Sequence, residues 1–291
     1  MKGLFNLREL STEKINEIVP TALNFKKGIK SVLYPGTKMA TLFFENSTRT
    51  HYSFIAAMLN LGIKPVQVNL ELSSIKKGES LYDTVKMFEC AGFDGVVIRH
   101  TKDGYYNELS GINIPIFNGG DGVSDHPTQT LLDLVTIYEE FGSFEGLKIC
   151  IIGDISHSRV AHGDAEIMKR LGMKVYICGP NEFLDNTAES MTPDEACEIA
   201  DIIMLLRVQF ERHESNMGMS LTEYHQKFGL TKSRMLRMND SSIIMHPAPI
   251  NRGVEIANEV VECKKSRIFA QMTNGVYTRM AVIHMVLDGK L

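Results

Sequence analysis

The sequence predicts an α/β protein with two domains, each built on a mostly parallel sheet flanked by helices. Three observations support this fold class. Apolar strand-like segments alternate with helix-like segments along the chain, as parallel sheets require. The 291 residues are enough for two domains with separate cores. Hydrophobic residues make up 44% of the chain and charged residues 23%, which is typical of globular proteins.

The first domain is expected to span residues 1–135. Its strand series begins with the apolar run at 38–44, and a helix follows in which Phe54 and Met58 recur at helical spacing. A further helix is expected over 79–92. This βαβα order predicts helices on both faces of the sheet. The remaining strands are predicted at 64–70, 93–99 and 114–118.

The second domain is expected to span residues 136–274. The boundary falls within or just after an amphipathic helix at 127–142, which begins at Pro127, a residue favoured at helix starts. The segment 275–291, with a helix at 276–287, is expected to pack back on the first domain. A second α/β series is predicted, with strands at 147–154, 173–178, 199–207 and 241–247 and a helix near 158–171.

Charge and apolar content exclude several classes of function. The net charge of −4 argues against a general nucleic-acid binder, so any bound anion must be held by a local cluster of cations. No apolar run approaches the ~18 residues of a membrane span, and the N-terminus lacks the apolar core of a signal peptide. These features predict a protein that acts on neither nucleic acid nor membranes.

The five cysteines do not form a metal-binding or disulfide pattern. None lies in a CxxC pair, which argues against a zinc site and a disulfide framework. Cys90, Cys150 and Cys178 lie in apolar stretches and are expected to be small buried hydrophobic residues. A reducing, cytoplasmic location is therefore expected.

The most informative segment is FFENSTRT at 43–50. An apolar strand leads directly into Ser47-Thr48-Arg49-Thr50, and a helix follows. Helix N-termini present unpaired N–H groups and a partial positive charge, so hydroxyls and a guanidinium at this point suit a phosphate. The alternative is a helix capped by Ser47 or Thr48, with Arg49 in solvent. This segment by itself leaves both interpretations open.

Other polar residues follow apolar strands. Arg99 ends the strand at 93–99, at the carboxyl edge where open α/β sheets bind ligands. The glycine-rich turn GDGVSDHPTQ places His126 and Gln129 at a helix start. The lysine-containing loop SSIKKGES at 73–80 is, from its composition, a solvated surface loop.

Taken together, these segments resemble the aspartate/ornithine transcarbamoylase family, and within it the catalytic chains of aspartate transcarbamoylases. The resemblance covers nearly the whole chain and rests on seven runs in the family's order and spacing. These runs are FFENSTRT, SSIKKGES, VVIRH, GDGVSDHPTQTLLDL, IGDISHSRV, LLRVQFERH and MHPAP.

The resemblance implies a carbamoyl phosphate-binding first domain and assigns its residues. Ser47, Thr48, Arg49 and Thr50 match the phosphate-binding loop, and Arg99 and His126 match residues that contact the carbonyl oxygen. Of these, Arg49, Thr50, Arg99 and His126 are the expected catalytic residues. His51 departs from the family pattern, which often has Arg or Lys there.

Recognition of the carbamoyl amine is assigned in the same way. Gln129 and the backbone carbonyls of Pro247 and Ala248 match the groups that contact this amine. Ser73 and Lys77 match loop residues that a neighbouring subunit inserts into the site. The family's catalytic chains form trimers for this reason, and some bind a regulatory chain or another pathway enzyme.

The resemblance implies an aspartate-binding second domain, in which Arg159, Arg207 and Gln209 bind the two carboxylates. His162 and Asp164 depart from the family pattern. The implied reaction transfers the carbamoyl group of carbamoyl phosphate to L-aspartate, in de novo pyrimidine biosynthesis, without a metal or organic cofactor.

Three alternative functions fit the sequence less well. Ornithine transcarbamoylase shares the phosphate half, but its family carries HCLP where this chain has HPAP at 246–249, and a second arginine would repel ornithine. A dinucleotide oxidoreductase would show GxGxxG, whereas IIGDISHS has one glycine. A non-catalytic phosphate-binding module would not need the arginines of the second domain. Aspartate is therefore the expected acceptor.

Overall fold

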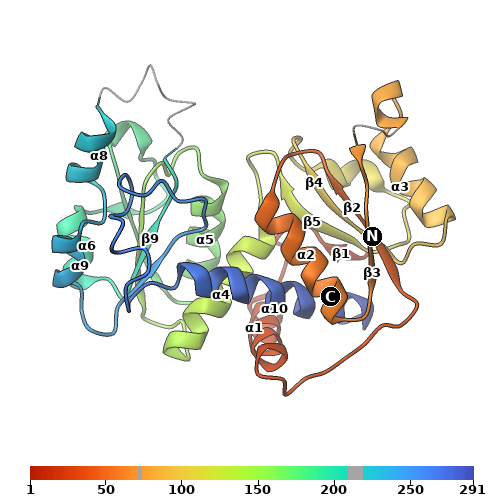
Figure 1. Cartoon of the computed structure of the whole chain (residues 1–291), viewed down its shortest axis with the longest axis horizontal. Coiled ribbons are helices and arrows are strands. Elements are labelled where there is room, and N and C mark those ends of the chain that lie inside the picture. Colours follow the sequence, from red (N-terminus) through yellow and green to blue (C-terminus); the bar gives the residue numbers. More distant parts are fainter. Residues whose placement is uncertain (71–73, 209–218) are drawn as a thin grey trace. The chain divides into compact units, whose positions relative to one another are not determined.

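The computed structural model describes residues 1–70, 74–208 and 219–291. Contacts between Cα atoms divide these residues into two compact units (Figure 1). Unit 1 consists of Met1–Val135 and Met272–Leu291, and unit 2 consists of Thr136–Gln271. Each unit contains one five-stranded sheet in which every pair of named strands is parallel. The predicted α/β class is confirmed.

The sheet of unit 1 has the strand order β1-β5-β4-β2-β3. The chain passes from β2 through α2 to β3 on one side of β2, and then through α3 to β4 on its other side. The bounds are β1 (Gly3–Leu4), α1 (Thr12–Lys26), β2 (Lys38–Phe43), α2 (Thr48–Asn60), β3 (Lys64–Gln67), η2 (Ser74–Lys77), α3 (Leu81–Cys90), β4 (Gly95–His100), η3 (Tyr105–Leu109), β5 (Ile116–Asp121) and α4 (Pro127–Phe141).

Both faces of this sheet are covered, because alternate strand residues point to opposite sides. On one face, Leu42 and Ile98 pack in a core cluster with Val85 and Phe88 of α3. The helices α2 and α10 (Ile268–Leu287) lie towards the other face of the sheet. Phe54 of α2 contacts Arg279 of α10. Figure 1 shows α10, in blue, between α1 and α2.

The sheet of unit 2 has the order β10-β9-β6-β7-β8. Its arrangement repeats that of unit 1: the first strand, β6, leads through α5 to β7 on one side, and the chain later returns to β9 on the other. The bounds are β6 (Lys148–Ile152), α5 (Arg159–Arg170), β7 (Lys174–Cys178), η4 (Asn181–Phe183), β8 (Glu189–Ser190), α6 (Pro193–Ile199), β9 (Ile202–Leu205), α8 (Leu221–Lys227), α9 (Lys232–Arg237) and β10 (Ile243–Met245).

Two expectations from the sequence need correction. The last helix begins at Ile268 instead of residue 276, although Gly275 lies within it. A Cβ at Gly275 would lie 3.2 Å from Leu132, so the glycine permits close packing of α10 on α4. Cys90 is exposed, because it lies at the end of α3 away from the buried Val85 and Phe88, whereas Cys150 and Cys178 are buried as expected.

Within the described ranges, no helix is long and apolar enough to cross a membrane. The same residues contain no group of three or more His, Cys, Asp or Glu side chains arranged to hold a metal ion. All five cysteines are free thiols.

Candidate active site

Each sheet has a topological switch point, the place where successive connections leave a strand in opposite directions. In unit 1 this point lies between β2 and β4, and in unit 2 it lies between β6 and β9. Open α/β sheets bind ligands outside the carboxyl ends of the strands at such points. The predicted residues follow all four strands: residues 47–50 follow β2, Arg99 lies near the end of β4, Arg159 follows β6 and Arg207 follows β9.

The N-terminus of α2 is exposed and its capping position is unusual. Ser47 occupies the N-cap, but its side chain makes no capping hydrogen bond. Ser11, Ser80 and Ser158 occupy the same position in α1, α3 and α5, and each accepts a hydrogen bond from a backbone N–H of its helix. The alternative of a Ser47 cap is therefore not observed. The first-turn N–H groups of α2 remain suited to an anion.

Arg99 is buried where β4 meets its neighbours in the sheet. Its Nε donates to Glu45 Oε2 at 3.1 Å, and its Nη1 donates to the carbonyl oxygen of Gly119 in β5 at 3.1 Å. Nη2 lies 3.1 Å from the same Glu45 oxygen. These contacts fix the guanidinium plane at the carboxyl edge of the sheet.

Thr50 and His126 are brought together from segments far apart in the chain. Both are buried, and Thr50 Oγ1 lies 3.2 Å from His126 Nε2. Gln129 is also buried, in the first turn of α4, where its Nε2 donates to both carboxylate oxygens of Asp133 at 3.1 Å. The structure therefore brings Thr50 of the expected phosphate-binding loop into contact with His126, which was predicted to contact the carbamoyl carbonyl.

The switch point of unit 2 carries two half-buried arginines, Arg159 and Arg207. Arg159 is the first residue of α5, whose N-cap Ser158 accepts from Ala161 N. Gly153 precedes this turn with a φ of +145°, and a Cβ there would lie 2.8 Å from the Cβ of Leu206. The glycine thus allows the chain segments that follow β6 and β9 to approach closely.

Pro247 and Ala248 follow β10, on the same edge of the sheet of unit 2. Ala248 has a φ of +57° and is the one non-glycine residue with positive φ in the described part of the chain. Its backbone N–H donates to His246 Nδ1 at 2.8 Å.

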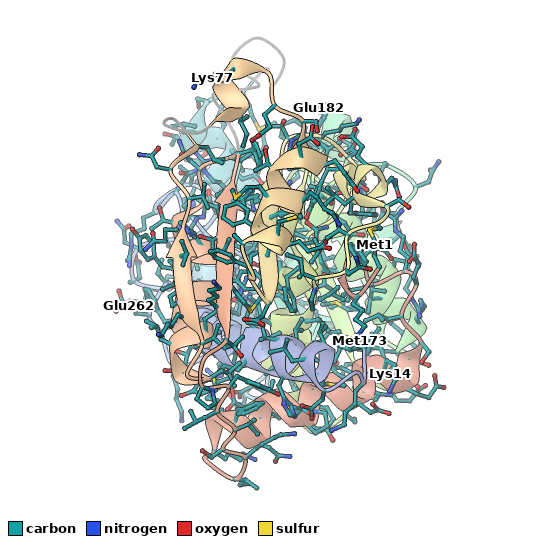
Figure 2. The ribbon with its side chains drawn as sticks, turned by 90° about the vertical axis from the view of Figure 1, so that its right-hand side faces the viewer. Met1, Lys14, Lys77, Met173, Glu182 and Glu262 are labelled. Carbon is teal, nitrogen blue, oxygen red and sulfur yellow. The ribbon has the colours of Figure 1, made fainter. Side chains whose placement is uncertain are left out.

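Residues 74–77, expected from the sequence to belong to a surface loop, form the short 3-10 helix η2. Lys77 is exposed at the end of η2, and Figure 2 shows it on the short coil at the top of the view. Ser73 and Gln209 lie outside the described residues.

The three side chains that depart from the family pattern are buried or have contacts in the fold. His51 Nε2 lies 2.9 Å from Thr41 Oγ1 and the ring stacks on Phe43, with 4.3 Å between centroids. Burial lowers the pKa of His51 from its usual value of 6.5. His162 Nε2 lies 2.8 Å from a carboxylate oxygen of Asp185, and Asp164 is fully buried in α5. Each of these side chains therefore packs or bonds within its own unit.

Several supporting residues were missed from the sequence. Arg279 of α10 donates to the Thr128 hydroxyl at 3.0 Å and lies 5.0 Å from the ring centroid of Phe54. Burial lowers the pKa of Arg279 to about 9, while the charge of Asp133 opposes this shift. The spacing of Gln129 and Asp133, four residues apart on a helix, was a usable signal. No sequence pattern near either residue indicated the contact between Arg279 and Thr128.

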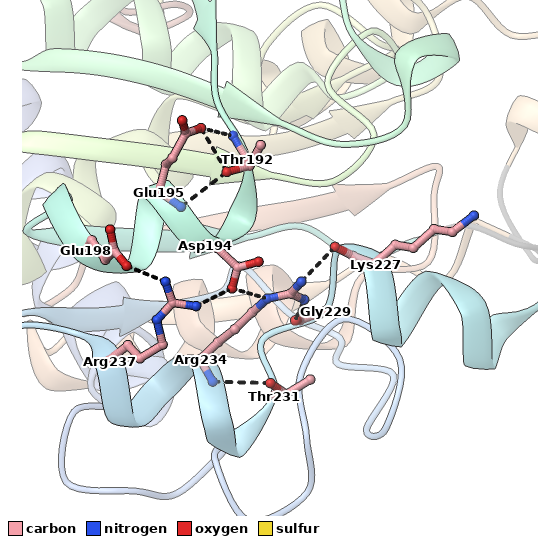
Figure 3. A network of polar contacts seen from close by, with 9 residues as sticks. All are labelled: Thr192, Asp194, Glu195, Glu198, Lys227, Gly229, Thr231, Arg234 and Arg237. Atoms are coloured by element: carbon pink, nitrogen blue, oxygen red, sulfur yellow. Dashed lines mark hydrogen bonds and ion pairs between the residues drawn. The ribbon is translucent and has the colours of Figure 1, made fainter.

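A second arginine cluster lies elsewhere in unit 2 and has a different role (Figure 3). Arg237 donates to Asp194 at 2.8 Å and pairs with Glu198. Arg234 donates to the same Asp194 oxygen at 3.3 Å and to the carbonyl of Gly229 at 2.7 Å. The carboxylates belong to α6 and the arginines to α9, so this network joins two helices of the fold.

Family models match both parts of the chain. Residues 2–139 match the carbamoyl-P binding domain of aspartate/ornithine carbamoyltransferase. Residues 145–286 match its Asp/Orn binding domain. The two matches together cover nearly the whole chain.

Individual relatives agree with the family models. The chain is 47% identical to the aspartate carbamoyltransferase catalytic subunit of Staphylococcus carnosus, covering 100% of this chain and 97% of that protein. The crystal structure of aspartate transcarbamoylase from Trypanosoma cruzi with N-(phosphonacetyl)-L-aspartic acid has a TM-score of 0.88 at 31% identity, covering 97% and 94% of the two chains. The complex of that enzyme with carbamoyl phosphate and aspartate has a TM-score of 0.86 at 30% identity, covering 97% and 95%. The chain belongs to the aspartate/ornithine carbamoyltransferase family.

Proposed function

We propose that this chain transfers the carbamoyl group of carbamoyl phosphate to the amine of L-aspartate, forming N-carbamoyl-L-aspartate and phosphate in pyrimidine biosynthesis. One observation carries the assignment of residues: both parallel sheets carry arginines at their topological switch points. Carbamoyl phosphate carries about two negative charges and aspartate carries two carboxylates. A chain of net charge −4 therefore has to concentrate cations where these substrates bind.

Unit 1 binds carbamoyl phosphate. The N–H groups at the start of α2, together with the side chains of Ser47, Thr48 and Arg49, donate to the phosphate oxygens. Arg99, His126 and Thr50 donate to the carbonyl oxygen, and the contact between Thr50 and His126 supports this role for two of them. Gln129 contacts the carbamoyl amine, together with the carbonyls of Pro247 and Ala248.

Unit 2 binds aspartate. Arg159 and Arg207 follow neighbouring strands, and an arginine fork can bind both oxygens of a carboxylate at once. Gln209 assists them. Two guanidinium groups would repel the side-chain ammonium of ornithine, so the same pair of residues favours a dicarboxylate over ornithine.

The reaction then needs orientation and charge stabilisation. The uncharged amine nitrogen of aspartate attacks the carbonyl carbon, and the carbonyl oxygen gains negative charge in a tetrahedral intermediate. The bond from this carbon to the bridging phosphate oxygen breaks, phosphate leaves, and the departing phosphate accepts a proton from the former amine. Removing one donor to such an oxyanion typically lowers kcat by ~10²–10³.

A product assay tests the proposal. The purified protein is incubated with carbamoyl phosphate and either L-aspartate or L-ornithine, and the carbamoylated amino acid and phosphate are measured. Equal amounts of carbamoyl aspartate and phosphate are expected, with no more than trace carbamoylation of ornithine. Formation of citrulline at the higher rate would overturn the choice of acceptor, and no product with either amine would overturn the activity.

A homotrimer with shared active sites is the second part of the proposal. Lys77, at the end of η2, is exposed on unit 1, as reach into a neighbouring subunit requires, and Ser73 belongs to the same polar run of the sequence. Arg49→Ala and Lys77→Ala should each be nearly inactive, because each removes a cation from every site. Dissociating and reassembling equal amounts of the two variants should restore roughly a quarter of the sites, since a mixed closed trimer has one interface with both residues intact. Absence of recovery despite demonstrated mixing would contradict shared sites.

We infer a cytoplasmic location, and the thiols support it. Free Cys150, Cys178 and Cys197 are buried and Cys90 is exposed, and free thiols persist in a reducing cytoplasm. Purification from the cytosolic fraction with all thiols titratable after unfolding is the expected outcome.

A further inference from the structure

We propose that the buried pair His246–Glu255 is a positioning device, which holds Ala248 in a left-handed backbone conformation and thereby aims the carbonyls of Pro247 and Ala248 at the carbamoyl amine. The inference rests on the proposed function, because it deepens the recognition of carbamoyl phosphate. Neither His246 nor Glu255 is needed to contact a substrate in this scheme. Both act through the loop between them.

The hydrogen bonds fix the protonation pattern of His246. Its side chain is fully buried and that of Glu255 is 1% exposed. The backbone N–H of Ala248 can only donate, so Nδ1, at 2.8 Å, must be the unprotonated acceptor nitrogen. The proton is therefore on Nε2, which donates to Glu255 Oε1 at 3.2 Å. Glu255 thus selects the tautomer that can receive the Ala248 N–H.

The conformation of Ala248 needs such support. A left-handed backbone is sterically unfavourable for a non-glycine residue, and residues in it persist where the surroundings hold them. The φ of +57° at Ala248 is held by the bond to His246, two residues earlier. The carbonyl of Pro247 belongs to the same peptide group as the Ala248 N–H, so fixing this N–H also fixes the direction of that carbonyl.

The pair is anchored on both sides. The backbone N–H of His246 donates to Gln271 Oε1 at 2.8 Å, and Glu255 Oε1 also accepts from the backbone N–H of Asn251 at 2.5 Å. Asn251 Nδ2 in turn donates to the carbonyl of Val208 at 3.0 Å. This chain of bonds connects the 246–251 loop with the residue after Arg207. In unit 2, one set of hydrogen bonds therefore connects the loop that carries Pro247 and Ala248 with the segment that carries Arg207.

Two substitutions of His246 separate its two bonds. His246→Asn can keep an acceptor near the position of Nδ1, whereas His246→Gln can keep a donor towards Glu255 but removes the acceptor for Ala248. We expect His246→Gln to weaken binding of carbamoyl phosphate about tenfold. This is the effect expected when one or two hydrogen bonds from the carbamoyl amine to the carbonyls of Pro247 and Ala248 are misaligned. His246→Asn should weaken it less. The inhibition constant of acetyl phosphate, which has a methyl group in place of the amine, should change less than about twofold in either variant.

Rescue distinguishes positioning from general destabilisation. Glycine adopts the left-handed conformation without the steric penalty, so Ala248→Gly in the His246→Gln background should recover part of the lost affinity. His225→Gln is the matched control, because His225 Nδ1 also contacts a backbone atom, Val254 O, at 2.8 Å. It should leave the preference for carbamoyl over acetyl phosphate unchanged.

Each outcome decides the question. If wild-type protein transfers carbamoyl to aspartate but His246→Gln keeps the full preference for carbamoyl over acetyl phosphate, the positioning role is wrong. Equal loss of affinity for both phosphates, without rescue by Ala248→Gly, would also overturn it in favour of a purely structural role. Absence of carbamoyl transfer by the wild-type protein would instead overturn the proposed function itself.

Discussion

The switch points of the two sheets have the same topology but differ in how the following helix begins. In unit 1, β2 leads to α2, whose N-cap Ser47 makes no side-chain capping bond. In unit 2, β6 leads to α5, whose N-cap Ser158 accepts from Ala161 N at 3.1 Å. An uncapped N-terminus suits a phosphate, which has several oxygens to satisfy, whereas a capped one leaves recognition to side chains, the role proposed for Arg159.

This difference shows that strand order locates a site without deciding its ligand. In each sheet, the edge expected to bind a ligand is the one formed by the carboxyl ends of the strands. The residues that follow the strands then determine whether backbone N–H groups or guanidinium forks make the contacts. The following variants are ways to break or sharpen the comparison.

The largest effect is expected for Arg207→Ala in unit 2. Truncating one partner of a buried charge pair costs roughly 2–5 kcal/mol, so kcat/KM for aspartate should fall steeply while binding of carbamoyl phosphate to the free enzyme is retained. Steady-state kinetics and calorimetric titration measure the two quantities. Arg237→Ala, in the network of Figure 3, is the control and should leave aspartate kinetics unchanged. An unaltered KM and kcat for aspartate in Arg207→Ala would remove that residue from the site.

Arg99→Ala tests the corresponding position in unit 1. We expect kcat to fall by about 10²–10³ at saturating substrates, because the developing oxyanion loses a donor. The loss should not be relieved by more aspartate, in contrast to that of Arg207→Ala. An unfolding transition near that of the wild type is required for this interpretation, since Arg99 also bonds Glu45 and Gly119. A kcat within about threefold of wild type would contradict the assignment.

Ser47→Ala and Ser158→Ala form a matched pair at the two helix starts. Losing the Ser158 cap should lower the free energy of unfolding by about 1 kcal/mol, whereas Ser47 has no capping bond to lose. Ser47→Ala should instead raise KM for carbamoyl phosphate by about fivefold, as expected for one hydrogen bond to a charged group. Chemical denaturation and initial-rate kinetics on both variants provide the comparison. Equal destabilisation by the two changes would mean that the helix starts do not differ.

The smallest effect concerns acid stability. Burial lowers the pKa of His51, His100 and His284, all in unit 1, below the usual 6.5. The unfolded chain therefore binds more protons, so stability is full above about pH 6.5 and declines as pH falls through the window below it. Hydrogen exchange, corrected for intrinsic rates, should show protection falling in unit 1 between about pH 6.5 and 5. Unchanged protection of unit 1 across this range would contradict the expectation.

Local sequence determined most of the elements and the edge at which the site lies. The strand at 38–44 and the helix after residue 50 could be predicted because apolar residues recur with the periods of strand and helix. The parallel arrangement followed from the alternation of these segments. Since parallel strands place their carboxyl ends on one edge, the polar residues after each strand, such as Arg99 and Arg207, could be assigned to that edge from sequence alone.

Other features depended on contacts between distant segments, which no local pattern encodes. The helix α10 continues through Gly275, which lies close to Leu132, although glycine disfavours helix. The contacts of Arg279 with Thr128 and of Arg99 with Glu45 join residues far apart in the chain. The left-handed Ala248, with its bond to His246 and the Glu255 that orients it, was likewise visible only in the fold. The sequence by itself thus determined the periodic elements and the residue types at their ends, because periodicity and strand-end chemistry are local. Only the tertiary structure decided which buried partners hold those residues, because desolvated hydrogen bonds and charges are satisfied by whatever the fold brings next to them.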